Sequence, residues 1–180
     1  SKGERTFDVL SASAGVEVEP CIVVDSDQEG YTRTVNRGLE RATWPVCICV
    51  DDVEPVSDGW LAELLEAFQL SDDVWFVGPS GDCRTPPQNS GRPGDGRSPR
   101  TVSHLAGFCL VVREAVRNHV GLMDEFFTHY GSDVDWQWRA RRYGGRAVWV
   151  PGVYVKHELH APRGEWFESD NMLFRSRYGG

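Results

Sequence analysis

Short, uninterrupted apolar runs recur along this chain, and each is bounded by polar residues. They cover residues 21–24, 46–50, 74–77, 105–112, 147–150 and 153–155. A strand with one face in water alternates apolar and polar residues, whereas a strand covered on both faces reads as a continuous apolar run. The runs therefore predict a sheet of buried strands, of the mostly parallel kind found in α/β proteins.

Helical patterns separate these runs. Tyr31, Val35, Leu39 and Ala42 are spaced four, four and three residues apart, and residues 60–68 carry a second apolar stripe. Alternation of strand and helix predicts βαβ units. A length of 180 residues suits one domain better than two. We expect a single α/β domain over residues 1–180, Rossmann-like, with a mostly parallel central sheet and helices on both faces.

Residues 80–103 interrupt this alternation. The segment, "SGDCRTPPQNSGRPGDGRSPRTVS", is rich in Gly and Pro, has no periodic apolar face and contains four arginines. A loop of this length inside a compact domain is usually either functional or disordered, and both interpretations are equally open. We expect a flexible loop within the single domain.

The composition argues against several classes of protein. The chain has 27 acidic and 19 basic residues, a net charge of -8, which opposes general binding to nucleic acid or anionic membranes. Its five cysteines lie mostly in apolar runs without a CxxC pair, which predicts reduced, buried thiols rather than disulfides or a zinc knuckle. No run approaches the ~20 residues that span a bilayer, and "SKGERTF" is no signal peptide. We expect a cytoplasmic protein without a transmembrane segment.

Two adjacent carboxylates, Asp51 and Asp52, directly follow the apolar run 46–50. In open α/β sheets, ligands bind beyond the carboxyl ends of the strands. Neighbouring carboxylates repel one another unless they share a cation or face water. The pair by itself fits a solvated turn before the helix at Trp60 at least as well as a metal site.

Six segments, one of which contains Asp51 and Asp52, occur in an order that resembles the family-2 glycosyltransferases of the GT-A type. They are "CIVVDS", "EGYTRTVNRGLERA", "CVDDVEPVSDGWL", "LAGFCLVVREA", "GLMDEFFTHYGSDVDWQWRARRYGGRAVWVPGVYVKH" and "WFESDNMLFRSRYG". The third looks like that family's DxD segment, and the resemblance covers nearly the whole chain. It implies a transferase that moves a sugar from a nucleotide-diphosphate donor, by default a UDP-sugar, to an acceptor hydroxyl.

The resemblance also implies which residues bind the donor and a divalent cation. A Mn²⁺ or Mg²⁺ ion stabilises the departing diphosphate, with Asp52 as the favoured ligand and His157 as a second one. A histidine after a strand is by itself more often a surface residue. The implied donor-binding residues are Asp25, Ser26, Arg33, Asn36, Asp51 and Gly107.

Asp133 stands where the family places its catalytic base. An acceptor hydroxyl must lose a proton as it attacks the anomeric carbon, so the resemblance implies an inverting reaction with Asp133 as the base. Asp133 equally suits the first turn of a helix, where Asp135 and Arg139 form a favourable i, i+4 pair. Both roles are compatible. We expect Asp135 to contact the acceptor or to be structural, Trp136 to stack on a sugar, and Trp138 to be in the core.

Three departures from the family pattern favour an alternative function. The DxD-like segment has one acidic position fewer, and Ser132 replaces a Glu. Residues 1–20 resemble the helix that follows the family's first strand, so either that strand has been lost, the sequence begins after it, or another segment fills its place. The alternative is a catalytically weakened protein that binds sugar or nucleotide. A nucleotidyltransferase would require a glycine- and lysine-rich phosphate loop, which is not visible. The acceptor, a glycan, a protein side chain or a nucleic-acid base, stays open.

Overall fold

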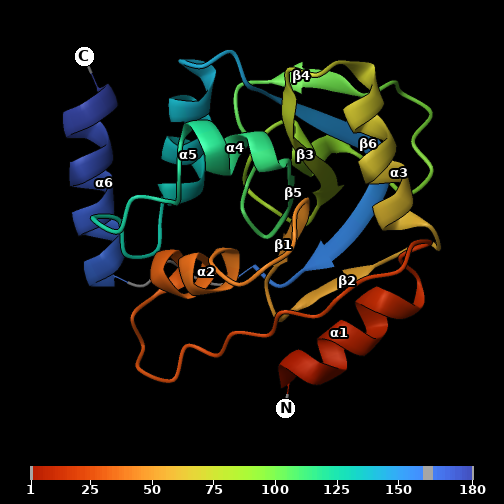
Figure 1. Ribbon diagram of the computed structural model, residues 1–180, viewed down its shortest axis with the longest axis horizontal. Helices are drawn as coiled ribbons and strands as arrows, with labels where there is room; N and C mark the ends of the chain where they lie inside the picture. The colour runs from red at the N-terminus through yellow and green to blue at the C-terminus, as the bar shows by residue number, and fades with distance from the viewer. Residues whose placement is uncertain (1, 160–163, 180) are drawn as a thin grey trace.

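The computed structural model describes residues 2–159 and 164–179 and shows a central sheet with helices on both sides (Figure 1). The sheet runs in the order β1 (Val46–Cys49), β5 (Cys109–Val112), β3 (Val74–Gly81), β6 (Arg146–His157) and β2 (Val53–Pro55), with β4 (Arg100–Val102) paired to β6. The α/β class is thus confirmed.

The strand directions correct the expectation of a mostly parallel sheet. Of the strand pairs in the described residues, β3 and β6 run parallel, whereas β1 with β5, β3 with β5, β2 with β6 and β4 with β6 run antiparallel. Continuous apolar runs report that both faces of a strand are covered, and helices cover both faces here. They carry no information on strand direction.

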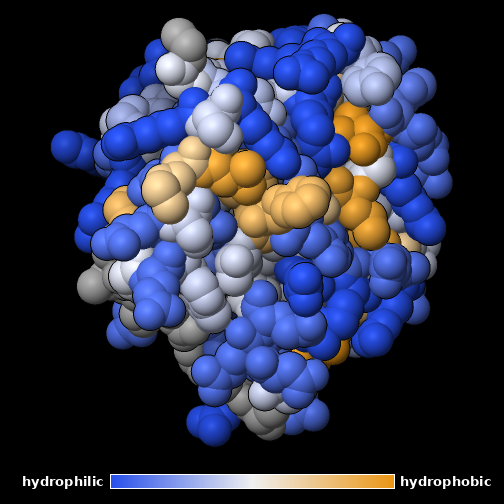
Figure 2. Space-filling view, turned by 90° about the vertical axis from the view of Figure 1, so that its left-hand side faces the viewer, coloured by the Kyte–Doolittle hydropathy of each residue, from blue (hydrophilic) through white to orange (hydrophobic). Residues whose placement is uncertain are grey.

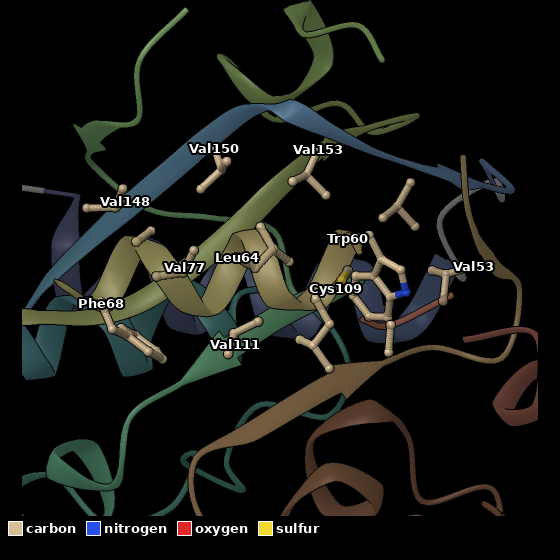
Figure 3. Close-up of a cluster of buried hydrophobic side chains, with 14 of the residues drawn as sticks. Val53, Trp60, Leu64, Phe68, Val77, Cys109, Val111, Val148, Val150 and Val153 are labelled. Atoms are coloured by element: carbon tan, nitrogen blue, oxygen red, sulfur yellow. The ribbon is translucent and has the colours of Figure 1, made fainter. Parts of the chain in front are cut away.

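Two apolar clusters fill the space between sheet and helices. On one face, α1 (Lys2–Ala12), α3 (Trp60–Glu66) and the 3₁₀ turn η1 (Ala67–Leu70) cover a cluster that includes Trp60, Leu64 and Cys109 (Figure 3). On the other face, α2 (Tyr31–Leu39), α4 (Glu114–His119) and α5 (Ser132–Arg141) cover a cluster that includes Phe76 and Trp136. The last helix, α6 (Gly164–Tyr178), packs outside α5.

Strand β6 joins the two predicted strands 147–150 and 153–155 into one. Its register against β3 jumps between the pairs Pro79 with Val150 and Ser80 with Tyr154, so Pro151 and Gly152 form an irregularity rather than a turn. The first half of β6 pairs with β4, and its last three residues pair with β2. This extension carries His157 to the edge of the sheet where β2 begins.

The apolar run 21–24 does not form a strand, contrary to prediction. Ile22 and Val24 are 42% and 66% exposed, and the segment is tied to α2 through a hydrogen bond from Arg37 to the carbonyl of Val24. In the described part of the chain, no strand lies on the outer edge of β1. An apolar run forms a strand only where it pairs with another strand, and residues 21–24 pair with none of the described strands.

Residues 80–103 contain the 3₁₀ turn η2 (Gln88–Ser90) and strand β4. Gln88 is fully buried, and Arg97 and Arg100 lie over the ring of Trp149 at 5.0 and 4.7 Å. Part of the predicted loop is therefore packed on the sheet, while its flexibility stays a prediction.

The face of the molecule drawn in Figure 2 is mostly hydrophilic. Figure 2 shows a hydrophobic band across the side of the molecule that carries α6, a helix that exposes Phe167 and Met172. Among the described helices, none combines the length and the apolar character needed to cross a bilayer.

Candidate functional site

Pairing of β2 with β6 brings together the two predicted metal ligands. Val53 is the register partner of His157, and the preceding Asp52 places its Oδ1 3.7 Å from Nε2 of His157. Nδ1 of His157 lies 3.0 Å from the carbonyl oxygen of Asp82, and the ring stacks on Phe108 with centroids 5.0 Å apart. With its proton on Nδ1 donated to Asp82, His157 presents the Nε2 lone pair toward Asp52.

This pair fits a divalent cation whose other ligands come from a substrate. One carboxylate and one imidazole suit Mn²⁺ better than Mg²⁺, which takes oxygen ligands almost exclusively. Within residues 2–159 and 164–179, the one cluster of three or more potential metal ligands consists of cysteines. Asp52 and His157 therefore do not belong to a cluster of three His, Cys, Asp or Glu side chains in the described residues. A diphosphate and water would have to complete the coordination.

Asp133 lies in the first turn of α5, as predicted, and its carboxylate is hydrogen-bonded to the backbone of Gly107. Its Oδ2 accepts a hydrogen bond from the Gly107 N–H at 2.7 Å, and its Oδ1 accepts one from Val134 N–H at 2.9 Å. Burial raises the pKa of Asp133 above its ordinary value of 3.8, against the opposing effect of the two N–H donors and of His104. The carboxylate is therefore a stronger base than an exposed aspartate.

Gly107 is held from both sides. The hydroxyl of Tyr31 donates to the Gly107 carbonyl at 2.9 Å, and a Cβ at position 107 would come within 2.3 Å of that hydroxyl oxygen and 3.1 Å of Oδ2 of Asp133. Glycine is required here because of close contacts. Burial, followed by the charge of Asp133, raises the pKa of Tyr31, so its hydroxyl stays a neutral donor.

Two buried glutamines position the segment that leads to Gly107. Gln137 of α5 accepts a hydrogen bond from Leu105 N–H and donates to the Leu105 carbonyl, both at 2.8 Å. Gln88 accepts a bond from Ala106 N–H at 2.7 Å. The sequence did not indicate that either glutamine belongs to the site, and the same holds for Tyr31, predicted only as part of a helix stripe, and for His104. Periodicity does not report which distant backbone group a polar side chain contacts.

The dipeptide Gly107–Phe108 joins the two halves of the site. Asp133 contacts the N–H of Gly107, and Phe108 stacks on His157, which faces Asp52. Two residues span about 7 Å of extended chain. The structure thus places Asp133 on Gly107 and the pair of Asp52 and His157 beside the adjacent Phe108.

Three other predicted donor-binding residues serve α2 or the surface. Asp25 accepts hydrogen bonds from the N–H groups of Glu29 and Gly30 at 2.8 and 3.0 Å, which fixes the turn before α2. Ser26 is exposed and bonds to Asp27, and Arg33 is exposed and pairs with acidic side chains. No contact ties these three to Asp133 or His157.

Asp51 and Asn36 complete the predicted donor set. Asp51 is exposed, and its carbonyl accepts a bond from Thr6. Asn36 is 2% exposed, and its amide bonds to the backbone N–H and C=O of Met123, at 3.0 and 2.9 Å. The donor-binding role predicted for Asn36 is therefore wrong, because its side chain is buried and engaged in holding α2 to the turn at Met123.

The two acceptor-binding predictions are also corrected. Asp135 is 0% exposed, and its carboxylate accepts bonds from Arg139, Arg177 and Tyr178, which confirms the predicted pair with Arg139 and gives Asp135 a structural role. Trp136 is likewise 0% exposed and packs against Phe76 in the core. The sequence pattern predicted Trp138 in the core and Trp136 on the surface of the site, but Trp136 is the buried one and Trp138 is partly exposed.

Concavity alone does not mark this site. A hollow of about 410 Å³ lies at the opposite end of β1, lined by residues that include Trp44, Phe68 and Arg113. It contains none of the predicted residues. The assignment of the site therefore rests on its convergent polar groups.

Neither the protein-family models nor the curated proteins include a match to this chain. Solved structures do match. The structure of GalNAc-T7 with UDP, GalNAc and Mn²⁺ superposes with a TM-score of 0.58 at 16% sequence identity, over 74% of this chain. GalNAc-T7 is a GT-A glycosyltransferase.

The chain has a GT-A-like fold. It spans 31% of the length of the GalNAc-T7 chain. At 16% identity the match establishes the GT-A-like architecture, while membership of family 2, the reaction and the substrates belong to the proposal below.

Proposed function

We propose that this protein is an inverting, divalent-metal-dependent glycosyltransferase of the family-2 type. It transfers a sugar from a nucleotide-diphosphate donor, by default a UDP-sugar, to an acceptor hydroxyl. The observation that carries the proposal is the convergence of Asp52 and His157 with Asp133 on either side of Gly107–Phe108. The GT-A-like fold, shared with a protein crystallised with UDP and Mn²⁺, supports it.

Asp52 and His157 would hold the cation, which supplies Lewis-acid stabilisation of the diphosphate leaving group. The carbonyl of Asp82 and the ring of Phe108 fix the orientation of the imidazole, so the ligand is in place before the donor binds. Asp51, exposed next to Asp52, is proposed to contact the donor. Asp25, Ser26 and Arg33 are proposed to bind the nucleotide part of the donor.

Asp133 is proposed to remove the proton from the acceptor hydroxyl. Each carboxylate oxygen has two lone pairs, and the bonds from Gly107 and Val134 use one on each oxygen. The second lone pair of each oxygen is left to accept a bond from the hydroxyl group of the acceptor substrate. The same bonds hold the carboxylate in one orientation, and Gly107 brings the backbone next to it. The acceptor itself, a glycan, a protein side chain or a nucleic-acid base, is not specified by these residues.

One observation favours a second candidate, a binding protein without turnover. Both oxygens of Asp133 already bond to backbone N–H groups, which is also what a purely structural carboxylate in the first turn of a helix would do. Such a protein would keep the GT-A-like fold and the cation pair while Asp133 merely ties α5 to Gly107.

A donor-hydrolysis and transfer assay separates the two candidates. UDP release is measured from a panel of UDP-sugars with Mn²⁺, for the wild type, Asp133→Asn and the surface control Asp72→Asn. The enzyme proposal expects turnover that falls by about 10²–10⁴-fold in Asp133→Asn and is unchanged in Asp72→Asn. Donor binding without turnover in all three supports the binding protein, and absence of both binding and turnover overturns both.

A further inference from the structure

Three of the five free cysteines meet on one face of the sheet. Cys47 and Cys49 are two residues apart on β1, so both point to the same face, and Cys109 on β5 is the register partner of Cys49. The two Sγ–Sγ contacts of Cys49 are 3.6 Å to Cys47 and 3.8 Å to Cys109, and all three sulfurs lie within 4.8 Å of one another.

These separations match the edges of a metal–thiolate polyhedron. With Zn–S bonds of about 2.3 Å, two sulfurs of a tetrahedral site are about 3.8 Å apart. Cysteines that merely fill a core do not have to converge on a common point. Here three sulfurs from two strands do so.

The three cysteines differ in burial. Cys109 is fully buried in the cluster that contains Trp60, as Figure 3 shows, whereas Cys47 and Cys49 are partly exposed. β1 is the edge strand of the sheet in the described residues. A cation can therefore enter beside β1, keep a water as its fourth ligand and displace the thiol protons to solvent.

We propose that Cys47, Cys49 and Cys109 form a three-thiolate site for a soft divalent cation of the Zn²⁺ and Cd²⁺ class. Thiolate ligands select such cations over Mn²⁺ and Mg²⁺, so the site is chemically distinct from Asp52 and His157. It ties β1, which leads into Asp51 and Asp52, to β5, which follows Gly107 and Phe108. Cation binding there would brace the two strands that carry the candidate functional site.

The test titrates the fully reduced chain of 180 residues with Cd²⁺, and separately with Zn²⁺, in the absence of nucleotide. We expect one Cd²⁺ per chain with an ultraviolet thiolate-to-cadmium charge-transfer band, and Zn²⁺ protection of three thiols from a thiol-reactive reagent. Cys47→Ser and Cys49→Ser should each weaken Cd²⁺ binding by at least about tenfold, since loss of even an outer-shell partner costs that much.

Two matched controls keep the test decisive. The double variant Cys21→Ser/Cys83→Ser retains the three clustered thiols and should bind Cd²⁺ as the wild type does. Asp52→Asn/His157→Ala should also keep the charge-transfer band. The test of the thiolate site is therefore independent of whether the proposed glycosyltransferase function is correct. Circular dichroism of each variant checks folding, and Cys47→Ala, at a partly exposed position, replaces any serine variant that unfolds.

Three results overturn the proposal. The first is Cd²⁺ binding that Cys47→Ser and Cys49→Ser leave unchanged. The second is loss of the band in the Asp52→Asn/His157→Ala variant. The third is absence of any thiolate band in the reduced wild type.

Discussion

At the scale of single residues, Gly107 is the most constrained position of the candidate site. An alanine methyl there would lie 2.3 Å from the Tyr31 hydroxyl oxygen, so one of the two must move. We expect Gly107→Ala to lower the free energy of unfolding by about 1–3 kcal/mol, the usual cost of overpacking, and to weaken donor binding. Urea unfolding measures the first effect.

A double-mutant cycle identifies the cause of that loss. Tyr31→Phe removes the clashing oxygen, and by itself it should cost about 1 kcal/mol for the lost bond to the Gly107 carbonyl. If the clash is the cause, the combined variant loses less than the sum of the single variants. Additive losses would show that Gly107 is required for another reason.

The raised pKa of Asp133 predicts the pH dependence of transfer. Below that pKa the carboxyl is protonated and cannot accept the proton of an acceptor hydroxyl, so kcat/KM should fall with decreasing pH. Burial places this fall above the ordinary carboxyl value of 3.8. A kcat/KM profile between pH 4 and pH 9 should show one acidic limb in that range.

The same raised pKa also makes the stability of the fold depend on pH. The contribution of Asp133 to the unfolding free energy decreases as pH rises, whereas kcat/KM increases. A carboxyl whose folded-state pKa is raised stabilises the fold fully below its unfolded pKa and loses that contribution as pH rises through the folded pKa. Asp133→Asn lacks this titration. The unfolding free energy of the variant relative to the wild type should therefore rise with pH over the same interval, and a flat difference would contradict the shift.

At the scale of elements, the packing of α6 on α5 depends on buried carboxylates. Asp135 of α5 accepts bonds from Arg177 and Tyr178 of α6, and Asp170 of α6 accepts three from the N–H groups of residues 128–130. The His129 in that loop accepts a bond from Tyr31 N–H. Helix α6 thus fixes the loop that contains His129, and His129 in turn bonds to Tyr31, the residue whose hydroxyl contacts Gly107.

Asp135→Asn should therefore destabilise the fold without altering the chemistry. It leaves Arg139 and Arg177 beside a neutral group in a buried setting, and we expect the unfolding free energy to fall by about 2–4 kcal/mol. Thermal or urea unfolding measures it. Asp72→Asn, which breaks an exposed pair with Arg113, is the control and should cost less than about 1 kcal/mol. A donor KM that changes in Asp135→Asn would contradict a purely structural role.

At the scale of the whole molecule, donor and cation binding should stabilise the fold together. UDP at a hundred times its Kd, with Mn²⁺ present, should add about 2.7 kcal/mol to the unfolding free energy. Without Mn²⁺ the gain should be smaller, because Asp52 and His157 then have no cation to share with the diphosphate. Thermal unfolding over a series of UDP concentrations measures both values.

The variant His157→Gln tests whether this coupling passes through the proposed ligand. It should keep the stabilisation by UDP alone and lose the further gain from Mn²⁺. Equal gains in wild type and variant would place the cation elsewhere. Because the thiol cluster of Cys47, Cys49 and Cys109 prefers softer cations, Mn²⁺ should not compete for it.

The sequence by itself determined the class of the fold and the position of Asp133 in the first turn of a helix. Continuous apolar runs predicted covered strands: those at 46–50 and 74–77 became β1 and β3, and the two at 147–150 and 153–155 joined into β6. Asp133 lies in the first turn of a helix, as its spacing predicted. These features depend on local periodicity and on residue type, which a sequence states directly.

Only the tertiary structure decided which residues meet. Pairing of β2 with β6 joins Asp52 to His157, and pairing of β1 with β5 gathers three thiols that sequence spacing kept apart. Burial removed Asn36, Asp135 and Trp136 from the candidate site. Strand direction, register and burial depend on contacts between residues far apart in the chain, and a periodic pattern reports that a face is covered without reporting which partner covers it.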